Sequence, residues 1–266
     1  MELDQSYWNE RYQKQETGWD VGAISTPLKG YIDQLTNKNT AILIPGCGNA
    51  HEAVYLLQQG FTNVTIVDIA PTAVNAIQLK LKEFDAGHLQ IICGDFFELE
   101  QTFDLIIEQT FFCALPPSLR NVYTEKMVHL LQENGKLVGL LFNRHFEGGP
   151  PFGGEKLEYL SIFEPKFNVI KMEECYNSIM PRAGSELFFI LQKKENPWRT
   201  ADYGAKTLAT TNTTAAAAAP SNISLKVPHR SGSLLTLLLM KPKIINASRL
   251  MLTDQLKAVS FSAKQA

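Results

Sequence analysis

Short apolar runs alternate with longer segments of helical periodicity through the first 198 residues. Such alternation predicts an α/β domain with a mostly parallel sheet, because strands buried on both faces read as continuous apolar runs between helices. Helices are expected over about 50–59, ended by Gly60, and from Pro71 to about 84, since proline suits the first turn. The expected strands are TAILIP (40–45), NVTIVDI (63–69), LQIIC (89–93), FDLIIE (103–108), GKLVGLLF (135–142), FNVIKM (167–172) and SELFFILQK (185–193).

The charge changes sign along the chain. Residues 1–198 hold 16 Lys and Arg against 25 Asp and Glu, whereas residues 199–266 hold 9 against 2. We therefore divide the chain into a domain (1–198), a flexible Ala/Thr-rich linker (199–221) and a basic tail (222–266). The tail has one aromatic residue, Phe261, and basic tails without interleaved aromatics are usually solvated extensions, so no nucleic-acid partner is expected.

The composition narrows the class of protein. Its 45% hydrophobic content is that of a globular chain, and no apolar stretch approaches the roughly 18 residues that would span a bilayer. The polar start MELDQSYWNERYQKQ lacks the apolar core of a signal peptide, so a cytoplasmic protein without membrane contact is expected, and we expect a monomer. The 4 cysteines form no CxxC pair, which predicts reduced thiols and no metal site.

A glycine turn follows the first expected strand, in ILIPGCGNAHEA. Gly46 and Gly48 would lie at the carboxyl end of that strand, where open α/β sheets bind ligands and where glycine lets a ligand approach the backbone. Asp68 ends the second strand, where a carboxylate can accept hydrogen bonds from ribose hydroxyls. Together these features favour a ligand that contains a nucleoside.

The third position of the turn helps to choose the ligand. The GxGxxG fingerprint of dinucleotide-binding proteins would place a glycine at position 51, where this chain has His51. NAD is therefore only the second candidate for the ligand. S-adenosylmethionine lacks phosphate and needs instead a glycine turn, a ribose carboxylate and contacts for adenine. In CGDFFE, Asp95 could accept from the adenine amino group and Phe96 could wall the ring, although a turn residue and a core residue explain them equally well.

Seven segments in combination resemble the thiopurine S-methyltransferase family, in its plant and bacterial branch of thiol and halide methyltransferases. They are GWDVGAISTPL, LIPGCGNAHEA, DIAP, GDFF, FDLIIEQTFFCALPPSLR, GGPPFGG and PRAGSEL, and the resemblance covers about residues 6–195. It implies a class I methyltransferase fold, with a seven-stranded, mostly parallel Rossmann-like sheet whose last strand is antiparallel. It also implies S-adenosylmethionine as the methyl donor.

The resemblance also implies roles for particular residues. An amino-terminal segment would fold over the donor and offer aromatic faces to its sulfonium. Tyr12 departs from the tryptophan expected in plant relatives. The implied donor contacts are Trp8, Tyr12, Trp19, Gly46, Gly48, Asp68, Asp95, Phe96 and Glu108. Glu108 and Gln109 would reach toward the methyl group, although Glu108 could equally be a capping carboxylate.

Methyl transfer from a sulfonium needs mainly alignment and exclusion of water. A thiol with a pKa near 8.5 is already partly ionised at neutral pH, so a strong general base is optional. Cys47 and Cys113 are expected to be small buried residues rather than nucleophiles. The acceptor side is expected in the Gly/Pro-rich segments 143–154 and 177–186, with Phe152 as an apolar wall and Arg182 as a positive one.

The sequence therefore predicts an S-adenosylmethionine-dependent methyltransferase that acts on the sulfur of a small thiol. Within the same fold, a halide, thiocyanate or metalloid (tellurite or selenium) methyltransferase is the alternative. A non-catalytic nucleotide-binding module and an NAD-dependent oxidoreductase are the alternatives from other classes.

Overall fold

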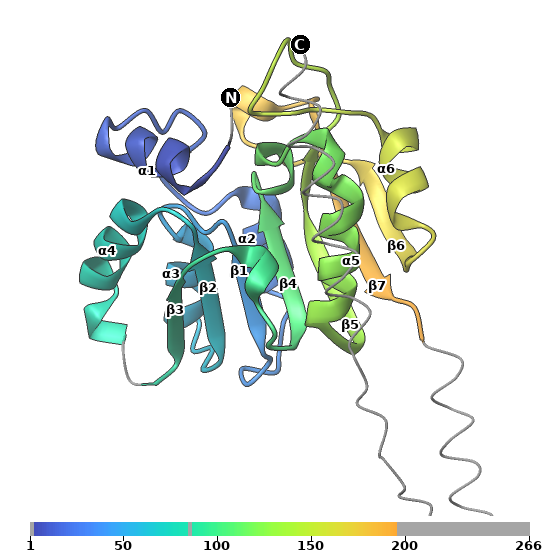
Figure 1. The fold of residues 1–266 in the computed structure, drawn as a ribbon. Helices are drawn as coiled ribbons and strands as arrows, with labels where there is room; N and C mark the ends of the chain where they lie inside the picture. The colour runs from blue at the N-terminus through green and yellow to red at the C-terminus, as the bar shows by residue number, and fades with distance from the viewer. Residues whose placement is uncertain (1–2, 85–86, 196–266) are drawn as a thin grey trace, which may run out of the picture. The chain divides into compact units, whose positions relative to one another are not determined.

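The expected strands form one sheet in the computed structural model, which describes residues 3–84 and 87–195 (Figure 1). The linker (199–221) and tail (222–266) expected from the sequence lie outside the described residues. Within the described part of the chain, the seven strands follow the order β3-β2-β1-β4-β5-β7-β6. Their bounds are β1 Ile42–Pro45, β2 Val64–Asp68, β3 Leu89–Cys93, β4 Phe103–Gln109, β5 Leu131–Phe142, β6 Phe167–Glu174 and β7 Glu186–Lys193.

The strands from β3 to β5 pair in parallel, whereas β7 runs antiparallel to both of its neighbours, β5 and β6. This confirms the expected topology with an antiparallel last strand. The strand β5 begins at Leu131, four residues before the expected start at Gly135, because Leu131 pairs with Phe103 ahead of a register shift in β4.

The helices agree with the periodicity except at their ends. The helix expected to reach residue 84 ends at Lys80, and a short 3-10 turn carries the chain through Phe84. The α-helices are α1 Gln5–Gln13, α2 Thr26–Ile32, α3 His51–Gln58, α4 Pro71–Lys80, α5 Arg120–Leu130 and α6 Lys156–Phe163. The 3-10 turns are η1 Lys82–Phe84, η2 Phe96–Glu98, η3 Phe112–Ala114, η4 Pro117–Leu119 and η5 Met180–Arg182.

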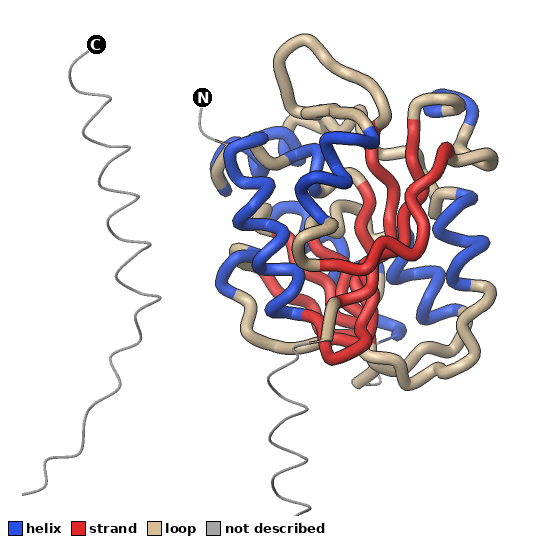
Figure 2. The backbone as a smooth tube through the Cα atoms, turned by 90° about the vertical axis from the view of Figure 1, so that its right-hand side faces the viewer, coloured by secondary structure: helices blue, strands red, loops and turns tan. Residues whose placement is uncertain are grey.

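Helices cover both faces of the sheet (Figure 2). Buried residues of α2, α3 and α4 share one apolar cluster with Ile42 and Ile44 of β1. Buried residues of α5 and α6 share the other cluster with Leu43, the residue between them. Because successive side chains of a strand point to opposite faces, the two clusters are the two layers of the core.

The helix α1 lies at the carboxyl end of β2. Gln5 Nε2 donates to the carbonyl oxygen of Ile69 at 3.1 Å, and Asn9 Oδ1 accepts from the Thr72 amide at 2.8 Å. The amino-terminal segment is therefore held at the end of the sheet where ligands of α/β proteins bind.

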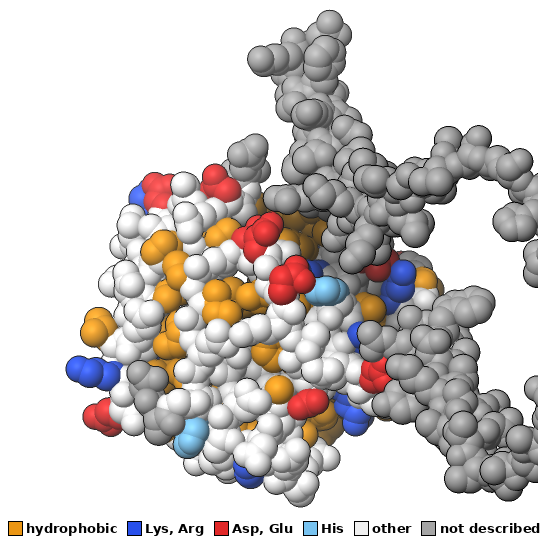
Figure 3. All heavy atoms as spheres, turned by 60° about the horizontal axis from the view of Figure 1, so that its bottom comes forward, with side chains coloured by type: hydrophobic (Ala, Val, Ile, Leu, Met, Phe, Trp, Pro, Cys, Tyr) orange, Lys and Arg blue, Asp and Glu red, His pale blue; other side chains and the backbone are white. Residues whose placement is uncertain are grey.

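The opposite end of the sheet lies at the bottom of Figure 1 and is turned toward the viewer in Figure 3, where acidic and basic side chains are interspersed.

Candidate functional site

A pocket of about 50 Å³ lies at the carboxyl ends of β1 and β4. Its lining comes from segment 19–23, the end of β1 with the glycine turn, the start of α3 and the end of β4. The order of the strands reverses between β1 and β4, and the crevice at such a switch point is the usual ligand site of an open α/β sheet. Of the expected site residues, Trp19, Gly46, Gly48 and Gln109 line this pocket.

The glycine turn requires its glycines. Gly46 and Gly48 have φ values of +56° and +52°, a region that side chains rarely adopt. A Cβ on Gly46 would lie 2.3 Å from the Phe111 ring, and one on Gly48 would lie 3.1 Å from Tyr12 Oη. The turn thus lets two aromatic residues, from the amino-terminal segment and from the β4 turn, come against the backbone.

Asp68 is buried at the end of β2 and holds the same turn. Its Oδ2 accepts from the Gly48 amide at 3.0 Å, and its Oδ1 accepts from the Ala70 amide at 2.9 Å. Burial raises the pKa of this carboxyl, and the backbone amides act in the opposite direction. Each carboxylate oxygen has a second lone pair, so the group can also accept from ribose hydroxyls.

The expected lid residues form an aromatic cluster. The Trp19 ring packs edge-on against Trp8 and Tyr12, with centroid distances of 5.6 and 5.7 Å. The Arg11 guanidinium lies 5.8 Å from the Trp19 ring centroid, so a cation already contacts this ring. Burial, together with the charge of Asp68, raises the pKa of Tyr12. Trp19 lines the pocket, whereas Trp8 and Tyr12 contact its ring and are not part of the lining.

A polar cluster that the sequence did not predict joins the amino-terminal segment to α3. Asp20 Oδ1 lies 2.8 Å from His51 Nε2 and accepts from the Gly22 amide at 2.7 Å, while Asp20 Oδ2 accepts from Asn49 Nδ2. Burial opposes ionisation of Asp20, but these donors hold its pKa below the usual value. Asp20, Asn49 and His51 all line the pocket. The available signal was that all three belong to GWDVG and GCGNAH, two of the segments that carry the resemblance.

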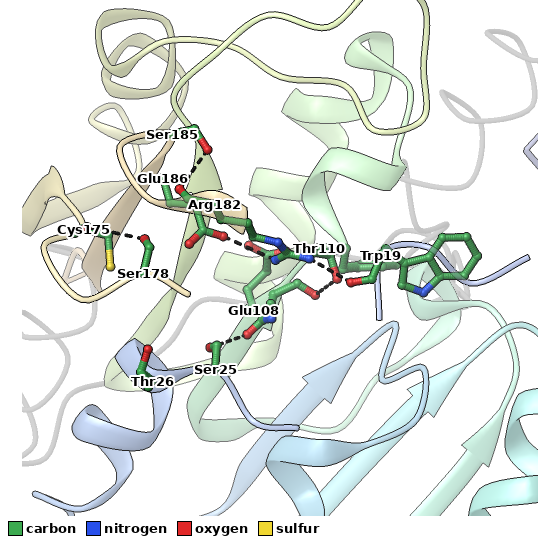
Figure 4. Close-up of polar contacts among 12 residues, drawn as sticks. Trp19, Ser25, Thr26, Glu108, Thr110, Cys175, Ser178, Arg182, Ser185 and Glu186 are labelled. Carbon is green, nitrogen blue, oxygen red and sulfur yellow. Dashed lines mark hydrogen bonds and ion pairs between the residues drawn. The ribbon is translucent and has the colours of Figure 1, made fainter. Parts of the chain in front are cut away.

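Arg182 lies beside the site and is bound by other parts of the chain (Figure 4), and its contact with a methyl acceptor stays a prediction. It is buried, and its Nη2 donates to the Trp19 carbonyl oxygen at 2.8 Å. Its Nη1 lies 3.3 Å from Glu186 Oε1, and the guanidinium carbon lies 5.4 Å from the Phe142 ring centroid. The side chain therefore ties η5 to the lid segment, and it does not line the pocket.

Gln109 and Glu108 point to opposite faces of β4. Gln109 lines the pocket, and its Oε1 accepts from Ser25 Oγ at 2.6 Å. Glu108 is fully buried on the other face, where its Oε1 accepts from the amides of Phe111 and Phe112 at 2.8 and 2.9 Å. Burial raises the pKa of Glu108 to about 7 against the pull of these two amides. Glu108 thus closes the turn after β4 and does not line the pocket.

This turn holds strain next to the pocket. Thr110, a β-branched residue, has a φ of +59° and lines the pocket. Within the described residues, Glu108 Oε2 and Tyr123 Oη have no hydrogen-bond partner.

The remaining expected residues lie outside the pocket lining. Asp95 is exposed and caps η2 by accepting from the Phe97 amide at 2.9 Å, whereas Phe96 is buried among aromatic rings of the core. The contact of these two residues with adenine stays a prediction. Phe152 lies in a loop that is bound to η3, where its amide donates to the Cys113 carbonyl oxygen at 2.6 Å. Its contact with an acceptor also stays a prediction.

The described residues contain neither a membrane-spanning helix nor a candidate metal site. In that part of the chain, no helix is long and apolar enough to cross a membrane. The same residues contain no group of three or more His, Cys, Asp or Glu that could hold a metal ion. Cys47 and Cys113 are buried free thiols, and burial raises the pKa of both.

Comparison with known proteins assigns the family. The model of the thiopurine S-methyltransferase family matches residues 3–200. The chain belongs to this family. It is 30% identical over 184 residues to probable thiol methyltransferase 2 of Arabidopsis thaliana, covering 67% of this chain and 81% of the relative. It is 27% identical to thiocyanate methyltransferase 1 of the same plant, covering 69% and 83% of the two chains. It is 25% identical to thiopurine S-methyltransferase of Nitrosospira multiformis, covering 63% and 84%.

Solved structures share the fold. The 1,6-didemethyltoxoflavin-N1-methyltransferase of Burkholderia thailandensis, with bound S-adenosylhomocysteine, matches with a TM-score of 0.58 at 18% identity, covering 72% of this chain and 87% of that chain. The magnesium protoporphyrin IX methyltransferase of Synechocystis matches with a TM-score of 0.57 at 14% identity, covering 71% and 98%. The fold is that of class I methyltransferases, and this family member is an S-adenosylmethionine-dependent methyltransferase rather than an NAD-dependent oxidoreductase or a non-catalytic module.

The residues at the switch point fit this donor. The donor has an amino-acid part, a ribose and a sulfonium. These parts match, in turn, a glycine turn without room for a Cβ, a buried carboxylate at the end of β2 and an aromatic cluster beside them.

Proposed function

We propose that this methyltransferase transfers the donor's methyl group to the sulfur of a small, neutral thiol. The observation that carries the proposal is the charge of the pocket. Among the described residues that line it, Asp20 and Glu52 are acidic and none is Lys or Arg. Two carboxyl groups disfavour an anionic acceptor, whereas a thiol arrives uncharged and loses its proton only on reaction.

Two buried arginines do not supply the pocket with a free positive charge. The guanidinium of Arg182 is committed to Glu186 and to the Trp19 carbonyl, and that of Arg120 is committed to Glu158 and to the Gly153 carbonyl. The similarity to a probable thiol methyltransferase over 81% of its length supports the same acceptor class.

In this proposal the chain holds and aligns the reactants. The donor supplies an activated methyl group on a sulfonium when it is bound. Asp68 and the glycine turn bind the donor, and the Trp19 ring covers it. Gln109 and Thr110 form the wall along which the acceptor approaches. Alignment of this kind contributes about 7–11 kcal/mol in favourable intramolecular models.

Thiocyanate or halide methylation is the second candidate, because thiocyanate methyltransferase 1 of Arabidopsis thaliana is 27% identical over 190 residues. A turnover panel with labelled donor separates the candidates, using a small thiol, thiocyanate, iodide and tellurite as acceptors. We expect the highest kcat/KM for the thiol. A higher value for thiocyanate, iodide or tellurite would replace the proposal.

A further inference from the structure

We propose that His51, oriented by Asp20, is the general base that takes the proton of the thiol acceptor. The inference rests on the proposed function, because only an acceptor with a proton to lose needs a base. It adds a catalytic residue to a site whose chemistry otherwise requires only alignment.

The geometry is that of a base held by a second group. His51 Nε2 lies 2.8 Å from Asp20 Oδ1, and the two side chains are 21% and 19% exposed. Asp20 is fixed in turn by the Gly22 amide and by Asn49 Nδ2. A carboxylate that binds one ring nitrogen sets the tautomer, stabilises the imidazolium and leaves the other nitrogen as the proton acceptor.

The location places this pair at the reaction. His51 and Asp20 line the same pocket as Gln109 and Thr110, at the switch point of the sheet. An acceptor sulfur that enters this pocket therefore approaches the wall that carries His51. Hydrogen-bond reach from base to acceptor is the geometric requirement for general base catalysis.

The step balances as follows. The acceptor's S–H bond breaks, and its proton moves to the free ring nitrogen of His51. The acceptor sulfur uses the freed electron pair to form the new S–CH₃ bond, and the sulfur of the donor keeps the pair of the broken C–S bond. His51 is left as an imidazolium paired with Asp20, and it returns its proton to water.

Other titratable groups surround His51. Glu52 lines the pocket from α3, Cys47 lines it from the glycine turn, and Lys80 of α4 donates to the Asn49 carbonyl oxygen at 3.2 Å. Glu52 is the rival base, but it is buried, and among the described residues no side chain holds it as Asp20 holds His51. Glu52→Gln is therefore measured beside the His51 variant.

The decisive experiment compares His51→Gln with the wild type on two thiols of different acidity. The thiol of 2-mercaptoethanol is less acidic than a cysteine thiol with a pKa near 8.5, so less than about 3% of it is ionised at neutral pH, and a base can raise its reactivity by about 30-fold or more. We expect His51→Gln to lower kcat/KM for 2-mercaptoethanol by about 10–30-fold. The loss should shrink to within about threefold for nitrothiophenol, which is already a thiolate, and for 2-mercaptoethanol as the pH is raised above its pKa.

A second readout does not depend on turnover. Thiophenol is bound to the enzyme with S-adenosylhomocysteine in place of the donor, and its thiolate absorbance is followed against pH. In the wild type the bound thiol should ionise at a lower pH than in His51→Gln, by about one pKa unit. His88→Gln, at an exposed histidine away from the pocket, is the matched control and should behave as the wild type.

The outcomes separate the two proposals. If the wild type methylates neither thiol, the proposed function fails. If the wild type methylates at least one and His51→Gln shows the same pH profile and thiolate titration, the base assignment is wrong. Equal losses for both thiols with a raised KM for the donor would also overturn it and would assign His51 to donor binding. A selective loss in Glu52→Gln alone would transfer the role to Glu52.

Discussion

Two buried carboxylates close two neighbouring turns of this sheet, and they serve different purposes. Asp68 is the last residue of β2 and Glu108 lies near the end of β4, and each accepts hydrogen bonds from two backbone amides. Asp68 holds Gly48, which lines the pocket, whereas Glu108 faces the core beside the unpartnered Tyr123 hydroxyl. The same chemistry therefore organises the ligand side of one turn and the core side of the other.

The difference comes from the position of each residue along its strand. In β4, Ile107 and Gln109 line the pocket, so Glu108 between them must point to the opposite face. Its turn still shapes the pocket, because it places Thr110 at a positive φ and Phe111 against Gly46. Glu108 thus acts on the site through the backbone.

Removing Glu108 should have a large effect on stability. Glu108→Ala leaves the amides of Phe111 and Phe112 without their acceptor, and each buried amide left unpaired costs about 1–3 kcal/mol. We expect a loss of about 3 kcal/mol in the free energy of unfolding, measured by urea denaturation at about pH 4.5, where the contribution of this group is complete. Glu108→Gln, which keeps one acceptor oxygen, should lose less, and Glu83→Ala, at an exposed glutamate, serves as the control. Equal stability of wild type and Glu108→Ala would contradict the clamp.

Glu108 should also make the stability of the protein depend on pH. The pKa of Glu108 in the folded protein is raised to about 7, so the folded state binds a proton that the unfolded chain releases above about 4.5. Stability from this group is complete below pH 4.5 and falls as the pH rises through 7, by a total of about 3 kcal/mol. Unfolding curves of wild type and Glu108→Gln from pH 4.5 to about 8 should therefore diverge. A constant difference across that range would rule out this titration.

Asp68 should affect donor binding as well as folding, because its removal also leaves the amides of Gly48 and Ala70 without their acceptor. If it accepts from the ribose hydroxyls, Asp68→Ala should weaken S-adenosylmethionine binding by about 1.5–3 kcal/mol, the range for hydrogen bonds to a charged group. Isothermal titration calorimetry measures this loss, with Glu108→Gln as the comparison that should bind almost normally. Unchanged affinity in a folded Asp68→Ala protein would remove Asp68 from the donor site.

The smallest effect is expected for the lid. Trp19→Ala should weaken binding of the cationic donor by about 0.5–2 kcal/mol more than that of the neutral product, because only the donor offers a charge to the ring. Calorimetry with S-adenosylmethionine and S-adenosylhomocysteine gives the two values. Trp8→Ala, whose ring supports Trp19 but does not line the pocket, should affect both ligands alike. Equal losses in Trp19→Ala would leave Trp19 as a packing residue.

The sequence predicted the sheet because buried parallel strands are continuous apolar runs, and Asp68 ends the second of them. The same property hid the direction of Glu108. A strand buried on both faces shows no alternation of apolar and polar residues, so nothing in FDLIIEQ separates the pocket face from the core face. The pocket lining reveals the direction of the Glu108 side chain, because Ile107 and Gln109 on either side of it face the pocket.

The local sequence pattern also could not predict contacts between segments that lie far apart in the chain. Asp20 and His51 are separated by 31 residues, and Arg182 binds the Trp19 backbone across 163. Arg182 was expected at the acceptor because a positive side chain in a Gly/Pro-rich loop is typical of a specificity loop. In the structure its guanidinium donates a hydrogen bond to the main-chain carbonyl of Trp19. Every residue carries such a carbonyl, so no sequence motif reveals this contact.

That choice of acceptor has a consequence for how the site can diversify. Since Arg182 recognises the peptide group of Trp19 and not its indole, the tether is indifferent to the side chain at that position. Replacing the ring alters what covers the pocket without releasing the segment that carries it. The covering surface can therefore vary by single substitutions, during evolution or by design, while the chain path over the site is inherited unchanged.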